Sequence, residues 1–244
     1  MKNNKTILII GATSDIAIAV AYRFALHGYN LQLAARNTDD LNPIVTDIKI
    51  KYGVDVFLHQ LDILNYAYFP TFISSLNTLP DTAICAVGLL GDQEDCEQSI
   101  ERSSVTMRSN YEGPSLLLGE IANHFEIRRA GTIIGISSVA GERGRGSNYI
   151  YGSAKAGFTA FLSGLRNRMS KSNVRVITVI PGFVHTQMTK DMNLPSLLTL
   201  LPETLSYRIF KNLNREIIYS SKRWYFIMLI IKLIPEKIFK RLKL

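Results

Sequence analysis

The sequence predicts an α/β fold, a doubly wound parallel sheet with helices on both faces, and three observations support this. Apolar, β-branched runs of strand length recur along the chain, for example at residues 6–10, 131–137 and 175–180. The first run leads through a turn of small residues, 11–17, into a helical apolar pattern, which is the opening of a Rossmann-type dinucleotide fold. A length of 244 residues, 47% of them hydrophobic, suits a single domain with a full core.

The turn after the first strand predicts an anion site, because free backbone amides and the helix dipole meet there. The ligand that such a turn favours is a dinucleotide pyrophosphate. Asp15 would repel that group unless its carboxylate caps the helix and points away, which is the arrangement we expect. The residues expected around the phosphates are Gly11, Thr13, Ser14, Asp15 and Ile16.

The second strand, residues 30–36, predicts which cofactor is bound. It ends in Arg36, at a place where a cofactor with a free ribose 2′-hydroxyl would require an acidic residue. Arg36 therefore favours NADPH over NADH. The alternative is a solvated arginine at a strand end, and Asp39 and Asp40 lie close enough in sequence to weaken the preference.

Two further strands are expected to end at the ligand. The third strand, 54–61, runs into Asp62 and Ile63, where Asp62 either hydrogen-bonds the adenine edge or caps the strand end. The run at 175–180 stops at a proline and a glycine, and the segment that follows it lies at the predicted ligand edge. The residues concerned are Pro181, Gly182, Val184 and Thr186.

Tyr151 and Lys155 are spaced to share one helix face and address one site. A lysine charge close to a tyrosine favours the phenolate, so we expect the pKa of Tyr151 to be lowered and Tyr151 to serve as an acid for an alkoxide. Ser138 lies 13 positions earlier, where an apolar strand enters a small-residue turn. The same spacing recurs in Tyr207 and Lys211, but no such strand precedes them, and we interpret that pair as structural.

From Thr6 to about Met188 the chain resembles the short-chain dehydrogenase/reductase family, through the turn at 11–17 and through Asn110, Ser138, Tyr151 and Lys155. By that resemblance, Tyr151 is the general acid, and Lys155 lowers its pKa and holds the nicotinamide ribose. Ser138 would bind the substrate carbonyl, and Asn110 would support a water-linked proton relay. The resemblance also implies that Pro181 and Gly182 line the nicotinamide and that Thr186 holds its carboxamide.

The chain departs from the family pattern in two loops. The phosphate turn carries Asp15 and Ala17 where the family usually has glycines. After the fourth strand, Cys85-Ala-Val-Gly88 replaces an Asn-Asn-Ala-Gly sequence, so this loop is either held differently or looser; Gly88 is still expected to contact the cofactor. Together with residues 138–145 and the basic tail, the departures resemble a subgroup that reduces polyprenyl-phosphate-linked keto sugars, the decaprenylphosphoryl-2-keto-pentose reductases.

The carboxyl-terminal segment, 207–244, is expected to be a basic, amphipathic extension of a reductase domain formed by 1–206. It contains ten Lys or Arg against two Glu, a balance of +8 that equals the net charge of the whole chain. Its apolar run is interrupted by Lys232 and ended by Pro235, so we expect it to lie on an anionic membrane surface rather than cross the bilayer. The alternative is packing on the domain or on a second subunit. Residues 187–205 are expected to form a substrate lid.

These patterns predict an enzyme that uses NADPH to reduce a ketone to a secondary alcohol, and the predicted substrate is a lipid-linked keto sugar. One alternative is a 3-oxoacyl-thioester reductase, with Arg128 and Arg129 as a docking patch for an acidic carrier protein. A second alternative is a non-catalytic, membrane-attached NADPH-binding sensor or scaffold. Nucleic acid is not an expected partner, since aliphatic rather than stacking aromatic side chains alternate with the charges.

The remaining composition adds further expectations. The amino terminus enters a strand too soon for a signal peptide, so a cytoplasmic protein, peripheral on the membrane, is expected. Cys85 in a strand and Cys96 in a loop predict no disulfide, and the four histidines have no ligand spacing, so no metal is expected. The family resemblance implies a homo-oligomer, a dimer or a tetramer.

Overall fold

The computed structural model describes residues 5–242 and confirms the predicted fold class. A sheet of seven strands, all paired in parallel, has the order β3-β2-β1-β4-β5-β6-β9. The strands are β1 (Thr6–Ile10), β2 (Asn30–Ala35), β3 (Val56–Gln60), β4 (Thr82–Cys85), β5 (Gly131–Ile136), β6 (Val174–Ile180) and β9 (Ile217–Tyr219). The short strands β7 (Phe183–Val184) and β8 (Thr199–Leu200) form a separate parallel pair.

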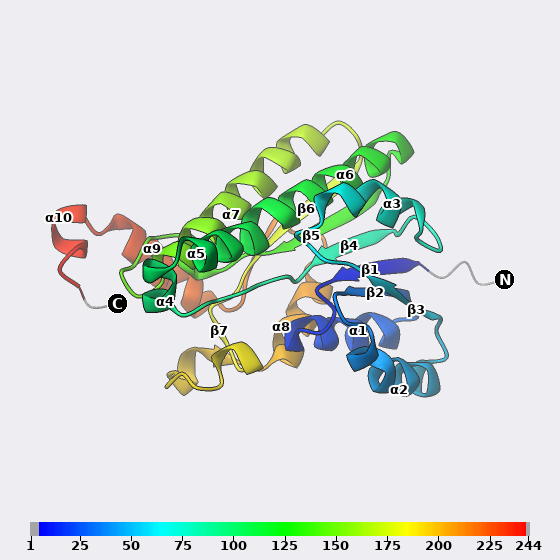
Figure 1. Cartoon of the computed structure of the whole chain (residues 1–244), viewed down its shortest axis with the longest axis horizontal. Coiled ribbons are helices and arrows are strands. Elements are labelled where there is room, and N and C mark those ends of the chain that lie inside the picture. The colour runs from blue at the N-terminus through cyan, green and yellow to red at the C-terminus, as the bar shows by residue number, and fades with distance from the viewer. Residues whose placement is uncertain (1–4, 243–244) are drawn as a thin grey trace.

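Helices cover both faces of the sheet (Figure 1). The α-helices are α1 (Asp15–Leu26), α2 (Asn42–Tyr52), α3 (Phe69–Ser74), α4 (Gln93–Gln98), α5 (Ile100–Met107), α6 (Gly113–Arg128), α7 (Tyr149–Met169), α8 (Pro202–Lys211), α9 (Lys222–Leu233) and α10 (Glu236–Phe239). Short 3-10 turns are η1 (Asp39–Leu41), η2 (Tyr66–Tyr68), η4 (Val139–Gly141), η5 (Gln187–Thr189) and η6 (Ser196–Leu198), and η3 (Arg108–Glu112) is a π-helical turn.

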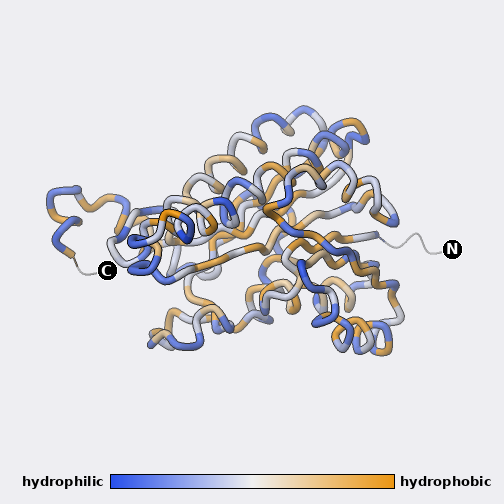
Figure 2. The backbone as a smooth tube through the Cα atoms, in the orientation of Figure 1, coloured by the Kyte–Doolittle hydropathy of each residue, from blue (hydrophilic) through white to orange (hydrophobic). Residues whose placement is uncertain are grey.

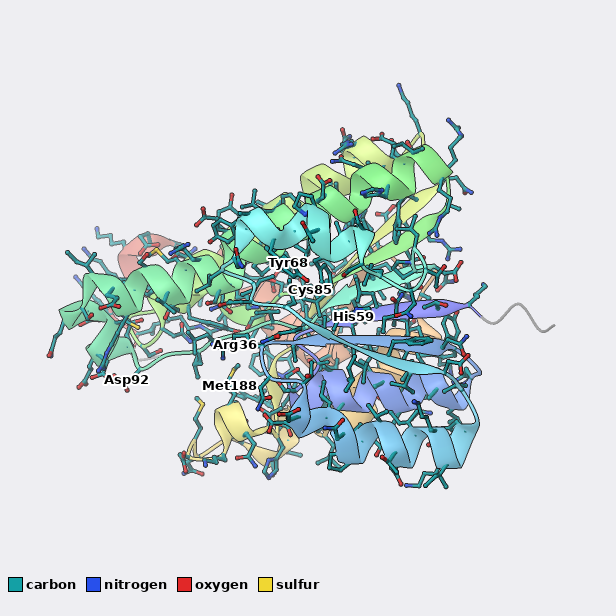
Figure 3. All side chains as sticks on the ribbon, turned by 45° about the vertical axis from the view of Figure 1, so that its right-hand side comes forward. Arg36, His59, Tyr68, Cys85, Asp92 and Met188 are labelled. Carbon is teal, nitrogen blue, oxygen red and sulfur yellow. The ribbon has the colours of Figure 1, made fainter. Side chains whose placement is uncertain are left out.

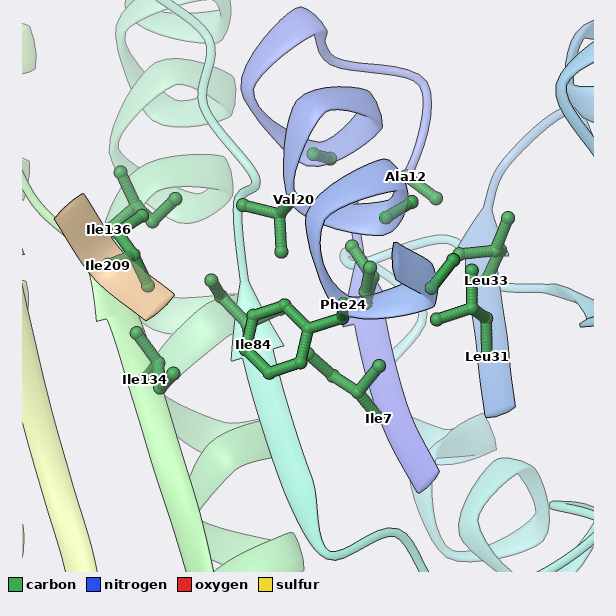
Figure 4. Packing of buried hydrophobic residues seen from close by; sticks show 14 of the residues in the cluster. Ile7, Ala12, Val20, Phe24, Leu31, Leu33, Ile84, Ile134, Ile136 and Ile209 are labelled. Carbon is green, nitrogen blue, oxygen red and sulfur yellow. The ribbon is translucent and has the colours of Figure 1, made fainter. Parts of the chain in front are cut away.

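The core consists of one apolar layer on each face of the sheet. Helices α1, α2 and α8 pack on one face, where Phe24 and Ile209 meet side chains of the central strands (Figure 4). Helices α3, α6 and α7 pack on the other face, where Phe125 and Phe158 are fully enclosed. Because every central strand is buried on both sides, its residues are almost continuously apolar, which explains why the strands could be located from sequence.

The strand order reverses between β1 and β4, and this reversal positions the candidate site. Both neighbours of β1, the strands β2 and β4, run parallel to it, with Ile10 paired to Ala34 on one side and to Cys85 on the other. The connections that leave the ends of β1 and β4 turn to opposite faces of the sheet, since α1 and α6 lie on opposite faces. A crevice is expected outside the carboxyl ends of strands at such a point.

The predicted division of the chain at residue 206 does not correspond to a structural boundary. Residue 206 lies inside α8, whose Leu205 and Ile209 are fully buried against α1 and the sheet. Strand β9, which follows α8, pairs with β6 and completes the main sheet. Although this segment is basic in composition, it contains a helix and a strand, α8 and β9, that belong to the domain. The outer ends of the two predicted segments, residues 1–4 and 243–244, lie outside the described residues.

The part of the tail after β9 packs on the domain with one side and is exposed on the other. Trp224 and Met228 of α9 are buried against Val139 and Ile180, whereas Phe226, at 58% exposure, belongs to the opposite side. Apolar and polar residues alternate along this end of the chain in Figure 2. Within residues 5–242, no helix combines the length and the apolar character needed to cross a bilayer.

Candidate active site

A cavity of about 450 Å³ opens outside the carboxyl ends of β1, β4, β5 and β6. Its walls come from the turn after β1, the loop after β4, the turn after β5, the start of α7 and the segment after β6. Of the predicted site residues, it is lined by Gly11, Thr13, Ser14, Asp15, Ile16, Arg36, Ile63, Gly88, Ser138, Tyr151, Lys155, Pro181, Gly182, Val184 and Thr186. Residues predicted from widely separated motifs therefore meet in one cavity.

The turn after β1 has the shape of a phosphate cradle. Gly11 has φ +79°, and a methyl group there would lie 2.9 Å from Val87 N, so a side chain is excluded for two independent reasons. Ser14 caps α1, its Oγ accepting a hydrogen bond from Ala17 N at 3.2 Å. The first turn of α1 thus faces the cavity with backbone N–H groups, as an anion site requires.

The expectation that Asp15 caps α1 is wrong, because Ser14 takes that role. Asp15 is the first residue of α1, and its Oδ2 accepts a hydrogen bond of 2.8 Å from the backbone N–H of Gln187. The carboxylate therefore connects the phosphate turn to η5, the beginning of the predicted lid. This explains how an acidic residue is accommodated in the turn: its charge is directed to a backbone donor of another segment.

Tyr151 and Lys155 lie together near the start of α7, with Lys155 Nζ 5.7 Å from the centre of the Tyr151 ring. Lys155 Nζ donates hydrogen bonds of 3.2 Å to the carbonyls of Val87 and Ile136, which fixes it between the ends of β4 and β5. Burial lowers the pKa of Lys155 to about 8 and raises the pKa of Tyr151 to about 12, although a hydrogen bond with Ser138 acts in the opposite direction on Tyr151.

The expected lowering of the Tyr151 pKa by Lys155 is therefore wrong for the ligand-free protein. Desolvation raises the pKa of Tyr151, and the group that opposes this effect is the Ser138 hydroxyl rather than the charge of Lys155. The consequence is a phenol that keeps its proton at neutral pH and a lysine that holds its proton only up to about pH 8. A protonated phenol is the form that can donate to a developing alkoxide.

Asn110 does not line the cavity but holds the loop after β4. It is fully buried in the π-helical turn η3, and its Nδ2 donates to the carbonyls of Leu89 at 2.6 Å and Thr106 at 2.8 Å. Its Oδ1 accepts from Leu89 N at 3.1 Å. With Lys155 bound to Val87 O, these contacts tie down the loop that lacks the family's two asparagines, so the loop is held differently rather than loosely.

The turn after β5 positions Ser138, and the segment after β6 positions Gly182 and Thr186. Ser138 Oγ accepts a hydrogen bond from Ala140 N at 3.1 Å, which orients its hydroxyl at the cavity edge. Gly182 N donates to Ser220 Oγ at 2.9 Å. A methyl group on Gly182 would overlap the indole ring of Trp224, so α9 packs directly behind this wall of the cavity. Thr186 begins η5 and forms a reciprocal cap with Thr189.

Of the predicted cofactor contacts Arg36 and Asp62, the first lines the cavity and the second does not. Arg36 lines the cavity at the exposed end of β2, and Figure 3 shows it at the same end of the sheet as Met188. Asp62 is exposed and does not line the cavity; its Oδ1 accepts from Leu64 N at 2.9 Å, which is the strand-end cap that the sequence left open as the alternative. Cys96, expected in a loop, is buried in α4, and Cys85 lies in β4.

Sequence reasoning missed several residues of the cavity wall. Arg145 and Asn148 reach it from the loop before α7, and Phe183, Met188 and Met192 reach it from the segment after β6. In the sequence, Arg145 stands out only as the last residue of the segment 138–145, and no spacing rule distinguishes it from a surface arginine. The described segment 187–205 consists of η5, η6, β8 and the first turn of α8, and its last residue, Leu205, belongs to the core rather than to a lid.

The fold and the site define this chain as an oxidoreductase of the dinucleotide-binding α/β class, with a tyrosine–lysine pair at the carboxyl end of a parallel sheet. Residues 5–196 match the family model described as short chain dehydrogenase. The chain belongs to the short-chain dehydrogenase/reductase family.

Individual relatives agree with this assignment. An uncharacterized oxidoreductase of Mycobacterium tuberculosis is 33% identical over 203 residues, 82% of this chain and 81% of its own length. A 3-oxoacyl-[acyl-carrier-protein] reductase of Chlamydia trachomatis is 28% identical over 78% of each chain. A short-chain dehydrogenase of Sphingobium yanoikuyae, solved in complex with NADPH, superposes with a TM-score of 0.80 at 23% identity, covering 95% of this chain and 97% of that one.

Proposed function

We propose that the protein reduces a ketone to a secondary alcohol with NADPH, and that Tyr151 supplies the proton. The observation that carries this proposal is that Tyr151 lines the cavity together with Ser138 and with a lysine that is fixed by two backbone carbonyls. These groups share one cavity with a helix amino terminus suited to phosphates. NADPH, when bound, supplies the hydride.

The residues present fit that cofactor. Gly11 lets the turn after β1 pack directly against the backbone of Ala86 and Val87, and Ser14 caps α1, whose first residues line the cavity. Arg36, exposed on the cavity rim, is free of ion pairs within residues 5–242 and suits a ribose 2′-phosphate. We therefore propose Gly11, Ser14 and Arg36 as cofactor contacts and retain NADPH over NADH.

In the proposed reaction, Ser138 and Tyr151 both hydrogen-bond the carbonyl oxygen of the substrate. The Tyr151 hydroxyl then donates its proton as negative charge develops on that oxygen. Lys155 stabilises the phenolate that remains, and its position is fixed before the reaction begins. Asn110 acts by holding the loop at Leu89, which borders the cavity. The proton relay through water that the family resemblance implies remains a proposal for this chain.

We further propose a lipid-linked keto sugar as the substrate class, with the protein peripheral on the cytoplasmic face of a membrane. The exposed side of α9 supports this, because it includes the large apolar side chains of Tyr225, Phe226, Leu229, Ile230 and Leu233. Leu197 and Leu201, in the segment that follows β6, are also exposed, at 75% and 57%. Exposed lysines and an arginine, at 222, 237, 240 and 241, follow the same end of the chain, as an anionic lipid surface would favour.

The second candidate is a 3-oxoacyl-thioester reductase, which the Chlamydia relative favours. The proposed carrier-docking arginines weaken it. The Arg128 guanidinium is occupied by the carbonyls of Leu79, Pro80 and Ala130, and Arg129 Nη2 donates to Lys171 O. Both side chains thus have structural partners at the end of α6. The third candidate, a sensor without turnover, has no separate structural support.

The test is NADPH oxidation at 340 nm by the purified protein, with and without a lipid extract that contains polyprenyl-linked keto sugar. Tyr151→Phe should abolish turnover and retain NADPH binding. The matched control is Tyr207→Phe, because Tyr207 and Lys211 have the same spacing, are exposed on α8 and are joined by a hydrogen bond of 3.3 Å. Turnover that survives in Tyr151→Phe would refute the proposal, and binding of NADPH without oxidation by any ketone would favour the sensor.

The membrane part is tested separately by sedimentation with vesicles that contain phosphatidylglycerol. The double variant Phe226→Ser/Leu233→Ser should lose most vesicle binding and keep its activity on a soluble ketone. Its control is Ile100→Ser, a residue 91% exposed on α5. A native protein that fails to sediment with these vesicles would leave α9 as an interface between subunits, which size-exclusion chromatography would report as a dimer or tetramer.

A further inference from the structure

Arg145 lines the cavity, and little of the hydrogen-bonding capacity of its guanidinium is used by the described residues. Its Nε is buried and has no hydrogen-bond partner among residues 5–242. Its Nη2 donates only to the sulfur of Met228, at 3.5 Å, and a thioether is a weak acceptor. A guanidinium carries five N–H donors, and leaving a buried charged donor unpaired is unfavourable. Arg145 therefore has the character of a binding group whose ligand is a separate molecule.

Among the described residues, 5–242, no acidic side chain pairs with this cation. Glu142, three residues earlier, forms no ion pair with Arg145: its Oε1 accepts from Tyr219 OH at 2.7 Å and pairs with Lys232 at 2.6 Å, and its Oε2 is buried without a partner among the described residues. Burial lowers the pKa of the Arg145 guanidinium, and no nearby acid offsets that effect. An anion arriving in the cavity would do so.

A second unpaired polar atom belongs to the same loop. Asn148 lines the cavity and its Oδ1 is buried without a partner. The two residues are held together by a turn in which Asn148 N donates to Arg145 O at 3.1 Å. Asn148 immediately precedes α7, the helix that carries Tyr151. An acceptor for a hydroxyl and a donor for an anion thus line the same cavity as the proposed proton donor, Tyr151.

We propose that Arg145 and Asn148 form a subsite for the polar head of the substrate, in which Arg145 binds a phosphate ester and Asn148 accepts a hydrogen bond from a sugar hydroxyl. This inference rests on the proposed ketone reduction and names the chemical class of its substrate. The planar donor fork of arginine matches two phosphate oxygens, which a lysine cannot reproduce. The subsite is formed by the loop before α7, whereas the phosphates of the cofactor are expected at the turn after β1, so it adds to the cofactor contacts rather than repeating them.

Arg143 provides a matched control, because it lies in the same loop and is fully engaged. Its Nη2 donates to Ile234 O at 3.2 Å and pairs with Glu236 at 2.7 Å, and its guanidinium stacks over the Phe239 ring at 4.3 Å. It does not line the cavity. Arg143→Met should disturb the contact between this loop and α10 without changing the response to phosphate.

The experiment compares two ketones in the NADPH-saturated protein: the methyl glycoside of a keto-pentose, which is neutral, and the corresponding geranyl phosphodiester. Arg145→Met should lower kcat/KM for the phosphodiester by about 10- to 100-fold and for the neutral glycoside by less than about twofold, as expected for loss of a charge-assisted contact. Arg145→Lys should recover only part of the difference. Arg143→Met should affect both ketones equally.

Binding is measured in parallel by calorimetry with geranyl phosphate and with inorganic phosphate, again with NADPH present so that the cofactor's own phosphate sites are filled. Both ligands should bind more weakly to Arg145→Met than to Arg143→Met, and inorganic phosphate should compete with geranyl phosphate. Unchanged affinity in Arg145→Met, or equal loss of activity on both ketones, would overturn the subsite. If the native protein reduces neither ketone, the proposed function fails, and the calorimetry still decides the subsite.

Discussion

Replacing Lys155 with methionine should change how the stability of the ligand-free protein depends on pH. Lys155 is 2% exposed, and burial lowers its pKa from 10.5 to about 8. Between these two values the unfolded chain binds a proton that the folded protein does not, so the free energy of unfolding rises with pH across this window. Below about pH 8 the folded protein carries the full penalty of a buried cation.

The size of the effect follows from the same shift. The interval from 10.5 to about 8 corresponds to about 3 kcal/mol, since one pKa unit is equivalent to about 1.4 kcal/mol. Methionine removes this term but leaves the carbonyls of Val87 and Ile136 without their donor, which costs about 1–3 kcal/mol at every pH. Below about pH 8 the two proteins should therefore differ little in their free energy of unfolding, whereas this difference should change strongly with pH above that value.

The assay is urea unfolding of both proteins from pH 7 to pH 9.5. The native protein should gain about 2 kcal/mol relative to Lys155→Met over this range. Cys85, whose pKa is raised to about 11 by burial, acts in the opposite direction above about pH 9 but is present in both proteins and largely cancels. Lys211→Met, at an exposed lysine, is the control and should give a curve parallel to the native one. A parallel curve for Lys155→Met would refute the reasoning.

Three further predictions concern the cavity wall. Gly182→Ala should destabilise the protein by about 1–3 kcal/mol through overlap with Trp224, and Trp224→Leu in the same chain should recover part of this loss in a double-mutant cycle by urea unfolding. Asp15→Asn should tighten NADPH binding in a fluorescence titration, because it removes a negative charge from the phosphate turn; weaker binding would indicate that holding Gln187 matters more. Arg36→Glu should lower the ratio of kcat/KM for NADPH to that for NADH by about 10- to 100-fold, and an unchanged ratio would make Arg36 a solvated side chain.

The parts of the fold that could be predicted from sequence are those in which local pattern and tertiary structure agree. Strands such as β1 and β6 are buried on both faces, so nearly every residue in them is apolar. Strand β9 has only three residues and follows a basic stretch, and α8 exposes Tyr207 while burying Leu205 and Ile209. The composition of residues 207–244 as a whole does not reveal that α8 buries one side and exposes the other.

The same contrast applies to the site. Tyr151 and Lys155 share one helix, so their proximity follows from spacing alone. Asp15 and Gln187 are 172 positions apart, and no local rule predicts that the carboxylate accepts a backbone N–H there while Ser14 caps the helix. The direction of the Tyr151 pKa depends on how deeply both side chains are buried, which spacing does not contain.

The segment from η5 to β8 is held at both ends by residues that lie elsewhere in the chain. Asp15 holds the N–H of Gln187, while Arg223 and Trp224 donate to the carbonyls of Leu197 and Leu198 at 2.9 and 2.8 Å. Replacing residues 187–201 with those of another reductase, in order to change specificity, would therefore transfer the segment without the residues that hold it in place. The graft should order properly when positions 15, 223 and 224 are exchanged with it, so the transferable module of this enzyme is discontinuous in sequence.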